Sequence, residues 1–416
     1  MRQEVLDLKR NVYVREYYMN KIKGFIDSDL IKVITGIRRC GKSCFLQSIM
    51  NELVLRGINE KNIIDINLDS RKYKDIKTPD QLDNLIDSMV VSDDFNYVFI
   101  DEIQNVEGFE EIVNAYREDG NFSIFITGSN SYLLSGELST KLTGRYIEIE
   151  MFPLNFYEFI DMKRFLGIEI SKNNIEEFNE YIRFGGFPKT LEFSNSEDKE
   201  MYIQSVISQI IDKDIINHRI IRNKSVFDKI MTYLINNFGA TTSLSNILDY
   251  FNNQENIPIK RETLNNYIKI LENAKIIYKC PRFDIKSRKS LRGEEKYYLA
   301  DLGIYFSRNT DTRINYGPAL ENIVYTYLRA KGYSLSVGRI GKLECDFITR
   351  KNDDYQYIQV AMTIMDEKAE EREYRPFTKI QDNYPKYLFT IDQLLQKRDG
   401  IIHCNLIDFI AEKKEL

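Results

Sequence analysis

The sequence has few of the residues that build metal centres or disulfide frameworks. It contains only two histidines, so histidine-based metal sites and histidine acid–base catalysis are not expected. It contains five cysteines, an odd number, and none of them shows C-x-x-C spacing. This usage predicts reduced thiols in a cytoplasmic protein and argues against disulfides and zinc ligands.

Long apolar runs and an excess of basic residues are missing as well. No apolar stretch approaches the length of a membrane span and no signal peptide opens the chain, so we expect no membrane association. The formal net charge is −5, so a protein that coats nucleic acid with its whole surface is excluded and any such contact must be local. A length of 416 residues predicts two to four domains.

One stretch carries the clearest chemical signal, because it has the pattern G-x-x-x-x-G-K-S after an apolar run. In this pattern backbone N–H groups wrap phosphates, and glycine is needed because a Cβ would block the approach. We expect Lys42 to contact the β- and γ-phosphates, Ser43 to ligate Mg²⁺, and a helix starting near Lys42 to direct its positive end at the anion. The predicted nucleotide-binding residues are Gly36, Ile37, Arg38, Arg39, Cys40, Gly41, Lys42, Ser43 and Cys44.

A second apolar stretch, residues 96–100, leads directly into two acids. These acids, Asp101 and Glu102, follow the phosphate-binding pattern by about sixty residues, as in enzymes that hydrolyse nucleoside triphosphates. We interpret Asp101 as the residue that holds Mg²⁺ through water. We interpret Glu102 as the residue that positions or activates the attacking water.

Two more features belong to the predicted catalytic site. The stretch over residues 122–131 is predicted to be a buried strand that ends in small polar groups, and Thr127, Ser129 and Asn130 are all candidates for holding the water or sensing the γ-phosphate. Arg145 lies where several oligomeric ATPases carry an arginine that reaches a neighbour's γ-phosphate, so we expect a homo-oligomer. A surface or structural arginine is the alternative.

The pattern of the first half predicts an α/β fold class. Strands alternate with helices over residues 31–151, which predicts a parallel sheet with helices on both faces, and we assign residues 1–155 to a P-loop ATPase domain with N-terminal helices. Residues 156–222 are predicted to form a helical lid or linker, with a sharp break at Gly185 and Gly186.

Residues 223–312 show three helical patterns and a β-ribbon, which is typical of a winged-helix domain. The ribbon is locally basic, with seven basic residues against three acids between Lys279 and Lys296. Contact with the phosphates of double-stranded DNA is one interpretation, and a solvated hairpin on a protein-packing module is the other. The DNA contact is predicted for Lys286, Arg288, Lys289 and Arg292.

Residues 313–416 show a helix, a hairpin and mixed strands, which resemble the core of restriction-endonuclease-like folds. That core needs an acid on its second strand, met here by Asp346, and Glu-x-Lys on the third, where this chain has Gln359 and Ala361. Alanine cannot supply the charge of lysine, so cutting would require a lysine from elsewhere, with Lys342 and Lys386 as candidates. We predict a domain that is not catalytic.

The motifs together resemble a widespread prokaryotic family of AAA-like P-loop ATPases with a C-terminal domain of unknown function related to restriction-endonuclease-like folds. The resemblance covers nearly the whole chain. The resemblance supports the phosphate loop and the two acids as the residues that bind and hydrolyse the nucleotide. It favours Arg145 as an arginine finger, the arginine that reaches a neighbour's γ-phosphate. It also implies a role in genome maintenance or defence. It rests on Gly36–Ser43, Asp101–Gln104, Thr127–Ser129, Leu142–Arg145 before Phe152–Leu154, Gly185–Pro188, Leu343–Phe347 and Ile358–Val360.

These features predict a cytoplasmic Mg²⁺-dependent ATPase that couples ATP binding and hydrolysis to a conformational change, acting on DNA or a DNA-bound partner. Two alternatives stay open. One is a nucleotide switch with little turnover that recruits a protein partner, and the other is an ATP-gated nuclease. Catalytic roles are assigned to Glu102, Lys42, Arg145 and Thr127, and Mg²⁺ binding to Ser43 and Asp101.

Overall fold

The chain forms two compact units, Met1–Met151 and Phe152–Leu416. The structure is a computed structural model that describes residues 11–91, 94–128, 142, 144–216, 221–287, 289–309 and 313–416. Within these ranges, no helix combines the length and the apolar character needed to cross a membrane. The finer division into four parts stays a prediction.

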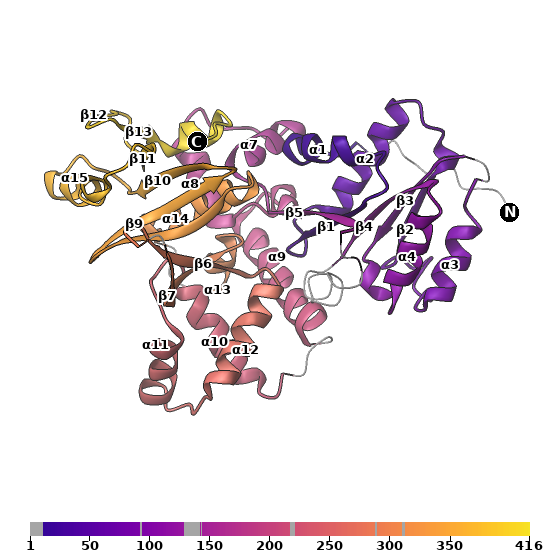
Figure 1. The fold of residues 1–416 in the computed structure, drawn as a ribbon, viewed down its shortest axis with the longest axis horizontal. Helices are drawn as coiled ribbons and strands as arrows, with labels where there is room; N and C mark the ends of the chain where they lie inside the picture. Colours follow the sequence, from indigo (N-terminus) through magenta and orange to yellow (C-terminus); the bar gives the residue numbers. More distant parts are fainter. Residues whose placement is uncertain are drawn as a thin grey trace. The chain divides into compact units, whose positions relative to one another are not determined.

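The first unit is built on a five-stranded sheet in which every strand pairs in parallel (Figure 1). The strand order is β2-β3-β4-β1-β5, so β4 lies between the strand that leads into the phosphate loop and the strand that ends in Asp101. The predicted parallel α/β sheet is confirmed. Its strands are β1 (Ile31–Gly36), β2 (Ile63–Asn67), β3 (Asn96–Asp101), β4 (Phe122–Thr127) and β5 (Tyr146–Met151).

Helices cover both faces of this sheet (Figure 1). On one face α3 (Pro79–Asp87) and α4 (Phe109–Glu118) bury apolar side chains against alternate residues of the strands. On the other face α2 (Lys42–Leu55) contacts β1 and β4, and α1 (Glu16–Ile22) contacts β5. Short 3-10 turns are η1 (Lys23–Phe25), η2 (Glu60–Asn62) and η3 (Ile103–Asn105).

The start of α3 is fixed by residues that lie close together in the sequence. The Thr78 hydroxyl accepts from the backbone N–H of Gln81 at 3.4 Å, and the Gln81 side chain accepts from the Thr78 N–H at 3.2 Å. This reciprocal capping box satisfies two helix-end donors, and Pro79 occupies the first turn, where no N–H partner is needed. Thr78 is therefore the N-cap of α3.

The second unit begins with a helical layer. α16, the last helix, packs on α7 and α8 near the start of the unit, so its two chain ends meet. α9 ends at Gln209 and continues as a π-helical turn. The elements are α7 (Phe156–Phe165), α8 (Asn174–Phe184), η4 (Pro188–Glu192), α9 (Ser196–Gln209), η5 (Ile210–Ile216) and α16 (Leu406–Ala411).

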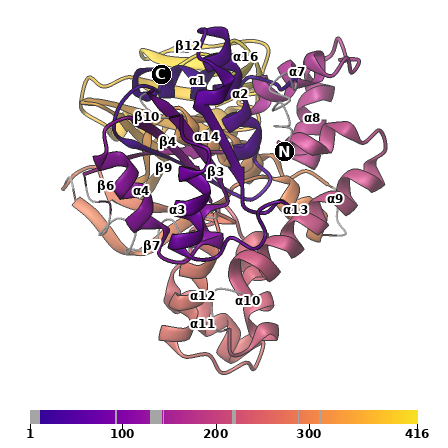
Figure 2. The same cartoon turned by 90° about the vertical axis from the view of Figure 1, so that its right-hand side faces the viewer.

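Three helices then gather at one end of the unit (Figure 2). α12 contacts α10 and α11, and an antiparallel hairpin of β6 and β7 follows. An isolated bridge between Thr242 and Glu295 adds a third short strand contact to the hairpin. The elements are α10 (Lys224–Asn236), α11 (Leu244–Asp249), η6 (Tyr250–Gln254), α12 (Arg261–Asn273), β6 (Ile277–Asp284) and β7 (Lys289–Leu299). The winged-helix assignment stays a prediction.

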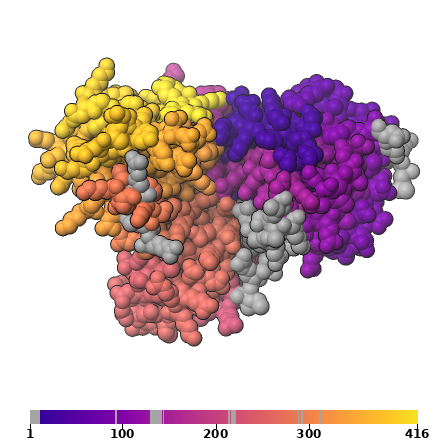
Figure 3. Space-filling view, viewed as in Figure 1, coloured from indigo at the N-terminus to yellow at the C-terminus, as the bar shows by residue number. Residues whose placement is uncertain are grey.

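The hairpin is also the edge of an eight-stranded sheet, with the order β12-β13-β11-β10-β9-β8-β6-β7. β6 pairs with β8 in parallel, so residues on both sides of the predicted boundary at 312 share one sheet. In the space-filling view the salmon surface of residues 224–273 projects from the rest of this unit (Figure 3). The remaining elements are α13 (Gly303–Arg308), α14 (Tyr316–Ala330), β8 (Ser334–Ile340), β9 (Leu343–Lys351), β10 (Asp354–Val360), α15 (Glu367–Tyr374), η7 (Phe377–Lys379), β11 (Lys386–Thr390), β12 (Lys397–Arg398) and β13 (Ile401–Asn405).

Candidate functional site

The phosphate loop joins the end of β1 to the start of α2, as the sequence predicts. Gly36 has φ 144°, and a Cβ there would lie 2.2 Å from the carbonyl oxygen of Met151. Gly41 has φ 105° and precedes the first helical residue, Lys42. Both glycines occupy backbone conformations that other residues rarely adopt, so the loop shape depends on them.

The ammonium group of Lys42 folds back over this loop. Its Nζ donates to the carbonyl oxygens of Gly36 at 2.9 Å and Ile37 at 3.4 Å, and the residue is 6% exposed. No carboxylate of the described residues pairs with it. A buried ammonium without a counter-charge is costly, and a bound phosphate would supply that charge.

Residues from outside the motif support the loop. Arg15 is buried, its Nη1 donates to the carbonyl oxygen of Cys40 at 3.4 Å, and its guanidinium lies 4.5 Å from the ring centroid of Tyr18. Complete burial raises the pKa of the Cys40 thiol, so Cys40 is a packing residue here. The sequence pattern gave no signal for Arg15.

The second half of the site lies at the carboxyl ends of β3 and β4. The buried carboxylate of Asp101 accepts from the Thr127 hydroxyl, and the Glu102 N–H donates to the same hydroxyl at 3.2 Å. Asn67 donates its Nδ2 to Asp101 Oδ2 at 3.4 Å. Thr127 therefore links the two acids. Asn67 was missed, although a polar residue at a parallel strand's carboxyl end is the signal that could have found it.

Glu102 has the left-handed backbone conformation φ 58°, ψ 47°, which is unusual for a residue other than glycine. Its side chain is half-buried and accepts a hydrogen bond from the Nε2 of Gln104. Strained backbone of this kind is typical of functional sites, where the surrounding structure maintains it.

Mg²⁺ fits the donor set at this edge. Asp101 offers a carboxylate and Ser43 an exposed hydroxyl in the first turn of α2. Within the described ranges, no cluster of three histidine, cysteine or acidic side chains forms a metal cage. Two protein oxygens suit Mg²⁺, because this ion usually takes its other ligands from phosphates and water.

Arg145 lies at the opposite, amino edge of the sheet. It directly precedes β5, its carbonyl accepts from the Ile31 N–H at the start of β1, and Nη1 donates to Asn114 Oδ1 at 3.0 Å. A six-residue strand separates it from the loop, a length of about 17 Å. The chain therefore does not bring Arg145 to its own loop. Ser129 and Asn130 lie outside the described residues.

Ion pairs neutralise part of the basic hairpin in the second unit. Lys279 pairs with Glu295 at 2.7 Å, and the buried Arg282 pairs with Glu344 at 2.8 Å. Lys286 and Lys289 are exposed. Arg288 and the side chain of Arg292 lie outside what the structure describes. The predicted basic surface is thus smaller than the sequence count implies.

The third paired base, Lys296, belongs to a buried polar cluster. Its Nζ lies 2.9 Å from carboxylate oxygens of both Glu321 and Glu344. Burial lowers the pKa of Lys296, but Glu321, Asp346 and Glu344 outweigh burial and hold it above its usual range. Burial raises the pKa of Asp346, and Glu321 adds to the increase.

The same cluster accounts for Gln359, one of the two positions that depart from the nuclease pattern, whereas Ala361 belongs to an apolar core. Gln359 accepts from the Asp346 N–H at 2.8 Å and donates to Glu373 at 2.9 Å, while Ala361 is buried in the apolar core. Lys342 is exposed after β8, and the Lys386 ammonium donates to the carbonyl oxygen of Asp382 at 3.0 Å. The base that the fold brings to these acids is Lys296, one of the basic residues of the predicted ribbon.

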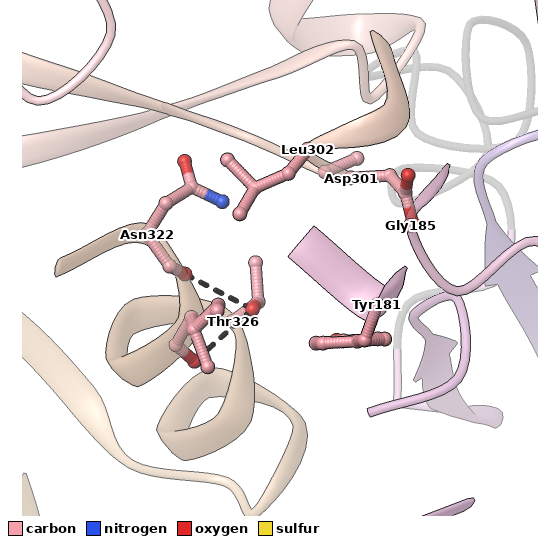
Figure 4. A pocket seen from close by; sticks show the side chains of 8 residues that line it. Tyr181, Gly185, Asp301, Leu302, Asn322 and Thr326 are labelled. Atoms are coloured by element: carbon pink, nitrogen blue, oxygen red, sulfur yellow. Dashed lines mark hydrogen bonds between the residues drawn. The ribbon is translucent and has the colours of Figure 1, made fainter. Parts of the chain in front are cut away.

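A small pocket in the second unit contains a buried carboxylate (Figure 4). Asp301 accepts from the backbone N–H groups of Gly186 at 2.6 Å and Gly303 at 2.8 Å. Burial raises the pKa of Asp301 to about 7. The pocket is lined by Tyr181, Gly185, Ala300, Asp301, Leu302, Asn322, Ile323 and Thr326. The Gly185–Gly186 break predicted from sequence therefore leaves room for the Asp301 carboxylate and donates a backbone hydrogen bond to it.

Comparison with known proteins places the first unit in a class that this loop and sheet define. Residues 28–160 match the protein family described as an AAA domain, and residues 175–312 match a domain of unknown function, DUF8612. The predicted AAA-like class is thereby confirmed. The relation to restriction-endonuclease-like folds stays a prediction.

Two relatives match most of the chain. An uncharacterized protein from Haemophilus influenzae is 35% identical over 401 residues, which cover 96% of this chain and 98% of that protein. An uncharacterized protein from Methanocaldococcus jannaschii is 31% identical over 366 residues, which cover 84% of this chain and 78% of that protein. The chain belongs to the protein family of these two relatives.

Two solved structures are similar to part of this chain. The Walker-type ATPase of Pyrococcus abyssi has a TM-score of 0.49 at 19% identity, covering 70% of this chain and 95% of that chain. The ORC2 protein of Aeropyrum pernix, solved as ADPNP–ADP complexes, has a TM-score of 0.39 at 11% identity, covering 76% of this chain and 92% of that chain.

Proposed function

We propose that this protein is a Mg²⁺-dependent ATPase that converts ATP binding and hydrolysis into a conformational change. One observation carries the proposal: the buried Lys42 ammonium contacts only carbonyl oxygens of its own loop, among the described residues, and so lacks a negative partner. The match of residues 28–160 to an AAA domain supports ATP as the source of that charge.

Each residue of the site has a separate task. Lys42 and the loop N–H groups bind the phosphates, and Ser43 and Asp101 would hold Mg²⁺, which neutralises phosphate charge when bound. Glu102 orients the attacking water and accepts its proton. The two hydrogen bonds of the Thr127 hydroxyl fix the position of the Asp101 carboxylate relative to the Glu102 backbone.

Turnover of MgATP by the full chain tests the proposal. Glu102→Gln keeps the shape of the side chain but removes the base, so kcat should fall about hundredfold or more while ATP binding persists. Glu52→Gln, at a surface pair with Arg56, is the matched control and should leave turnover unchanged. Equal phosphate release from Glu102→Gln and the natural protein at saturating ATP would refute the assignment.

Nucleotide binding provides the second test. Lys42→Ala should lose ATP affinity by about tenfold or more, because charge-assisted contacts to phosphate are lost. Its melting temperature should not fall, since the substitution also removes a buried charge that has no counter-ion. Undiminished ATP affinity in Lys42→Ala would overturn the role of the loop.

We infer that the second unit carries the conformational change to DNA or to a DNA-bound partner. The support is the helix group α10–α12, which is followed by a hairpin with exposed Lys286 and Lys289. Exposed lysines on such an element suit the phosphate backbone. A role in genome maintenance or defence would follow from DNA contact.

One observation favours a second candidate, a nucleotide switch with little turnover. The Glu102 carboxylate accepts a hydrogen bond from the side chain of Gln104, and this bond restricts the orientation of the carboxylate. If this bond restrains catalysis, Gln104→Ala should raise kcat several-fold with unchanged ATP affinity. A lower or unchanged kcat would leave the ATPase as the better description.

A further inference from the structure

Arg38 and Asp69 form an ion pair that crosses the nucleotide site. The Arg38 Nη2 lies 3.5 Å from Asp69 Oδ2, and the Arg38 side chain is only 11% exposed. Arg38 belongs to the phosphate loop after β1, and Asp69 belongs to the turn after β2. The pair therefore joins two segments from opposite sides of the catalytic strands.

The sheet order gives this pair its position. β3 and β4 lie between β1 and β2, so the two segments start about 14 Å apart, at about 4.8 Å per strand. A link between them at the carboxyl edge has to pass the ends of β3 and β4. These ends carry Asp101 and Thr127, where the terminal phosphate and its Mg²⁺ would lie.

Asp69 is held in place independently of Arg38. Asn105 Nδ2 donates to Asp69 Oδ1 at 3.1 Å, and the Asp69 N–H donates to Asn67 Oδ1 at 3.0 Å. Asn105 follows Glu102 by three positions in the turn η3. Asp69 thus contacts the phosphate loop through Arg38 and the segment after the catalytic acid through Asn105.

We propose that Arg38 is a sensor of the terminal phosphate, which exchanges Asp69 for the γ-phosphate of ATP. A phosphate carries more negative charge than a carboxylate and accepts from the same planar donors of arginine. ADP lacks the group that competes with Asp69, so Arg38 stays paired when ADP is bound. Exchange frees Asp69, and Asn105 passes the change to the segment that follows Glu102.

The proposal rests on the proposed ATPase function and gives the two partners opposite effects on binding. Arg38→Gln removes a contact to the terminal phosphate, so affinity for ATPγS should fall about tenfold or more. Asp69→Asn removes the competing acceptor, so affinity for ATPγS should rise about two- to fivefold. ADP affinity should change less than about twofold in both variants. A merely structural role would weaken both nucleotides in both variants.

The experiment measures binding of ATPγS and ADP to the full chain, with Mg²⁺ present. Arg56→Gln and Asp29→Asn are charge-matched controls from other surface pairs of the first unit. The effect of Asp69→Asn should vanish in an Arg38→Gln background. Equal losses for the two nucleotides in Arg38→Gln, or no gain for ATPγS in Asp69→Asn, would overturn the sensor. Failure of the natural protein to bind ATPγS would instead refute the proposed function.

Discussion

The Asp301 carboxylate accepts a hydrogen bond from the Gly186 backbone N–H at 2.6 Å, across 115 positions of the chain. The approach is close because Gly185, the preceding residue, has no side chain. A Cβ at Gly185 would lie 1.6 Å from Asp301 Oδ1, and one at Gly186 would lie 2.0 Å from the Leu154 carbonyl oxygen. The two glycines therefore fix how the first helices of the second unit pack on the segment before α13.

Gly185→Ala should destabilise the second unit strongly. The new methyl group would collide with a fully buried carboxylate, and overpacking of this kind costs about 1–3 kcal/mol in addition to the backbone strain. Chemical denaturation of the full chain measures the loss in free energy of unfolding.

Gly167→Ala measures the cost of a side chain at positive φ without a steric contact. Gly167 has φ 69° and a Cβ there meets nothing within 4 Å, whereas Gly185 combines φ 71° with ψ −164°, a conformation open essentially to glycine alone. The free energy of unfolding of Gly167→Ala should fall only by the cost of a left-handed residue, about 1–2 kcal/mol. Similar losses in the two variants would show that the contact with Asp301 is unimportant.

The two glycines illustrate what sequence alone could predict. Gly185 and Gly186 were recognised as a helix break, because that property is local. Their partner Asp301 could not be found, since nothing in the sequence pairs positions so far apart. The phosphate loop and the acids after β3 were recognised for the same local reason, as each is a strand followed by a fixed residue pattern.

The features that could not be predicted from the sequence all depend on tertiary structure. Lys296 was read as a surface base of the ribbon, whereas the fold buries it against Glu321 from α14. The pairing of Arg38 with Asp69 depends on the order of the strands in the sheet. The order of the elements along the chain does not determine it. Arg145 was assigned as a finger without a place in the sheet, and its position at the amino edge follows from the pairing of the start of β5 with the start of β1.

A pH dependence is expected from Lys32, which lies near the start of β1, between β4 and β5. Its Nζ donates to the Ser28 carbonyl oxygen at 2.7 Å and the Ser123 hydroxyl at 2.8 Å, and burial lowers its pKa to about 7. The folded state releases this proton near pH 7, and the unfolded state holds it to about pH 10. Between these values the unfolded chain binds more protons, so the contribution of Lys32 to stability rises with pH.

Comparison with Lys32→Met isolates that contribution. The free energy of unfolding should rise more steeply from pH 7 to pH 9 in the natural protein than in Lys32→Met. Other groups that titrate in this window are common to both proteins and cancel in the difference. Parallel curves would show that Lys32 keeps an ordinary pKa in the folded protein.

DNA contact by the hairpin predicts a salt dependence with a defined slope. Each lysine that neutralises a phosphate releases a counterion and contributes about 0.9 to the slope of log affinity against log salt. Neutralising Lys286 and Lys289 to glutamine should weaken binding to double-stranded DNA and reduce the slope by about two. Fluorescence anisotropy over a salt series measures both quantities.

Lys279→Gln is the control for this experiment. Lys279 lies on the same hairpin but is paired with Glu295 at 2.7 Å, so its charge is already compensated. Its substitution should leave the slope unchanged. If the double variant and the control behave alike, the hairpin does not contact the phosphates.

The position of Arg145 predicts catalysis between subunits. It lies at the amino edge of the sheet, about 17 Å from its own loop, and 43% of its side chain is exposed. If it acts as a finger it must enter the site of a neighbouring copy. Turnover per molecule should then rise with protein concentration, and Arg145→Ala should lower kcat about a thousandfold.

Mixing two inactive variants makes this prediction decisive. Lys42→Ala has an intact Arg145 but a defective loop, and Arg145→Ala has an intact loop but lacks the finger. When the two are combined, a site that joins the intact loop of one copy to the Arg145 of the other is complete. Activity should therefore reappear in the mixture although each variant alone is inactive. No recovery, with mixed assemblies shown to form, would assign Arg145 to the structural contacts that it makes with Asn114 and Glu118.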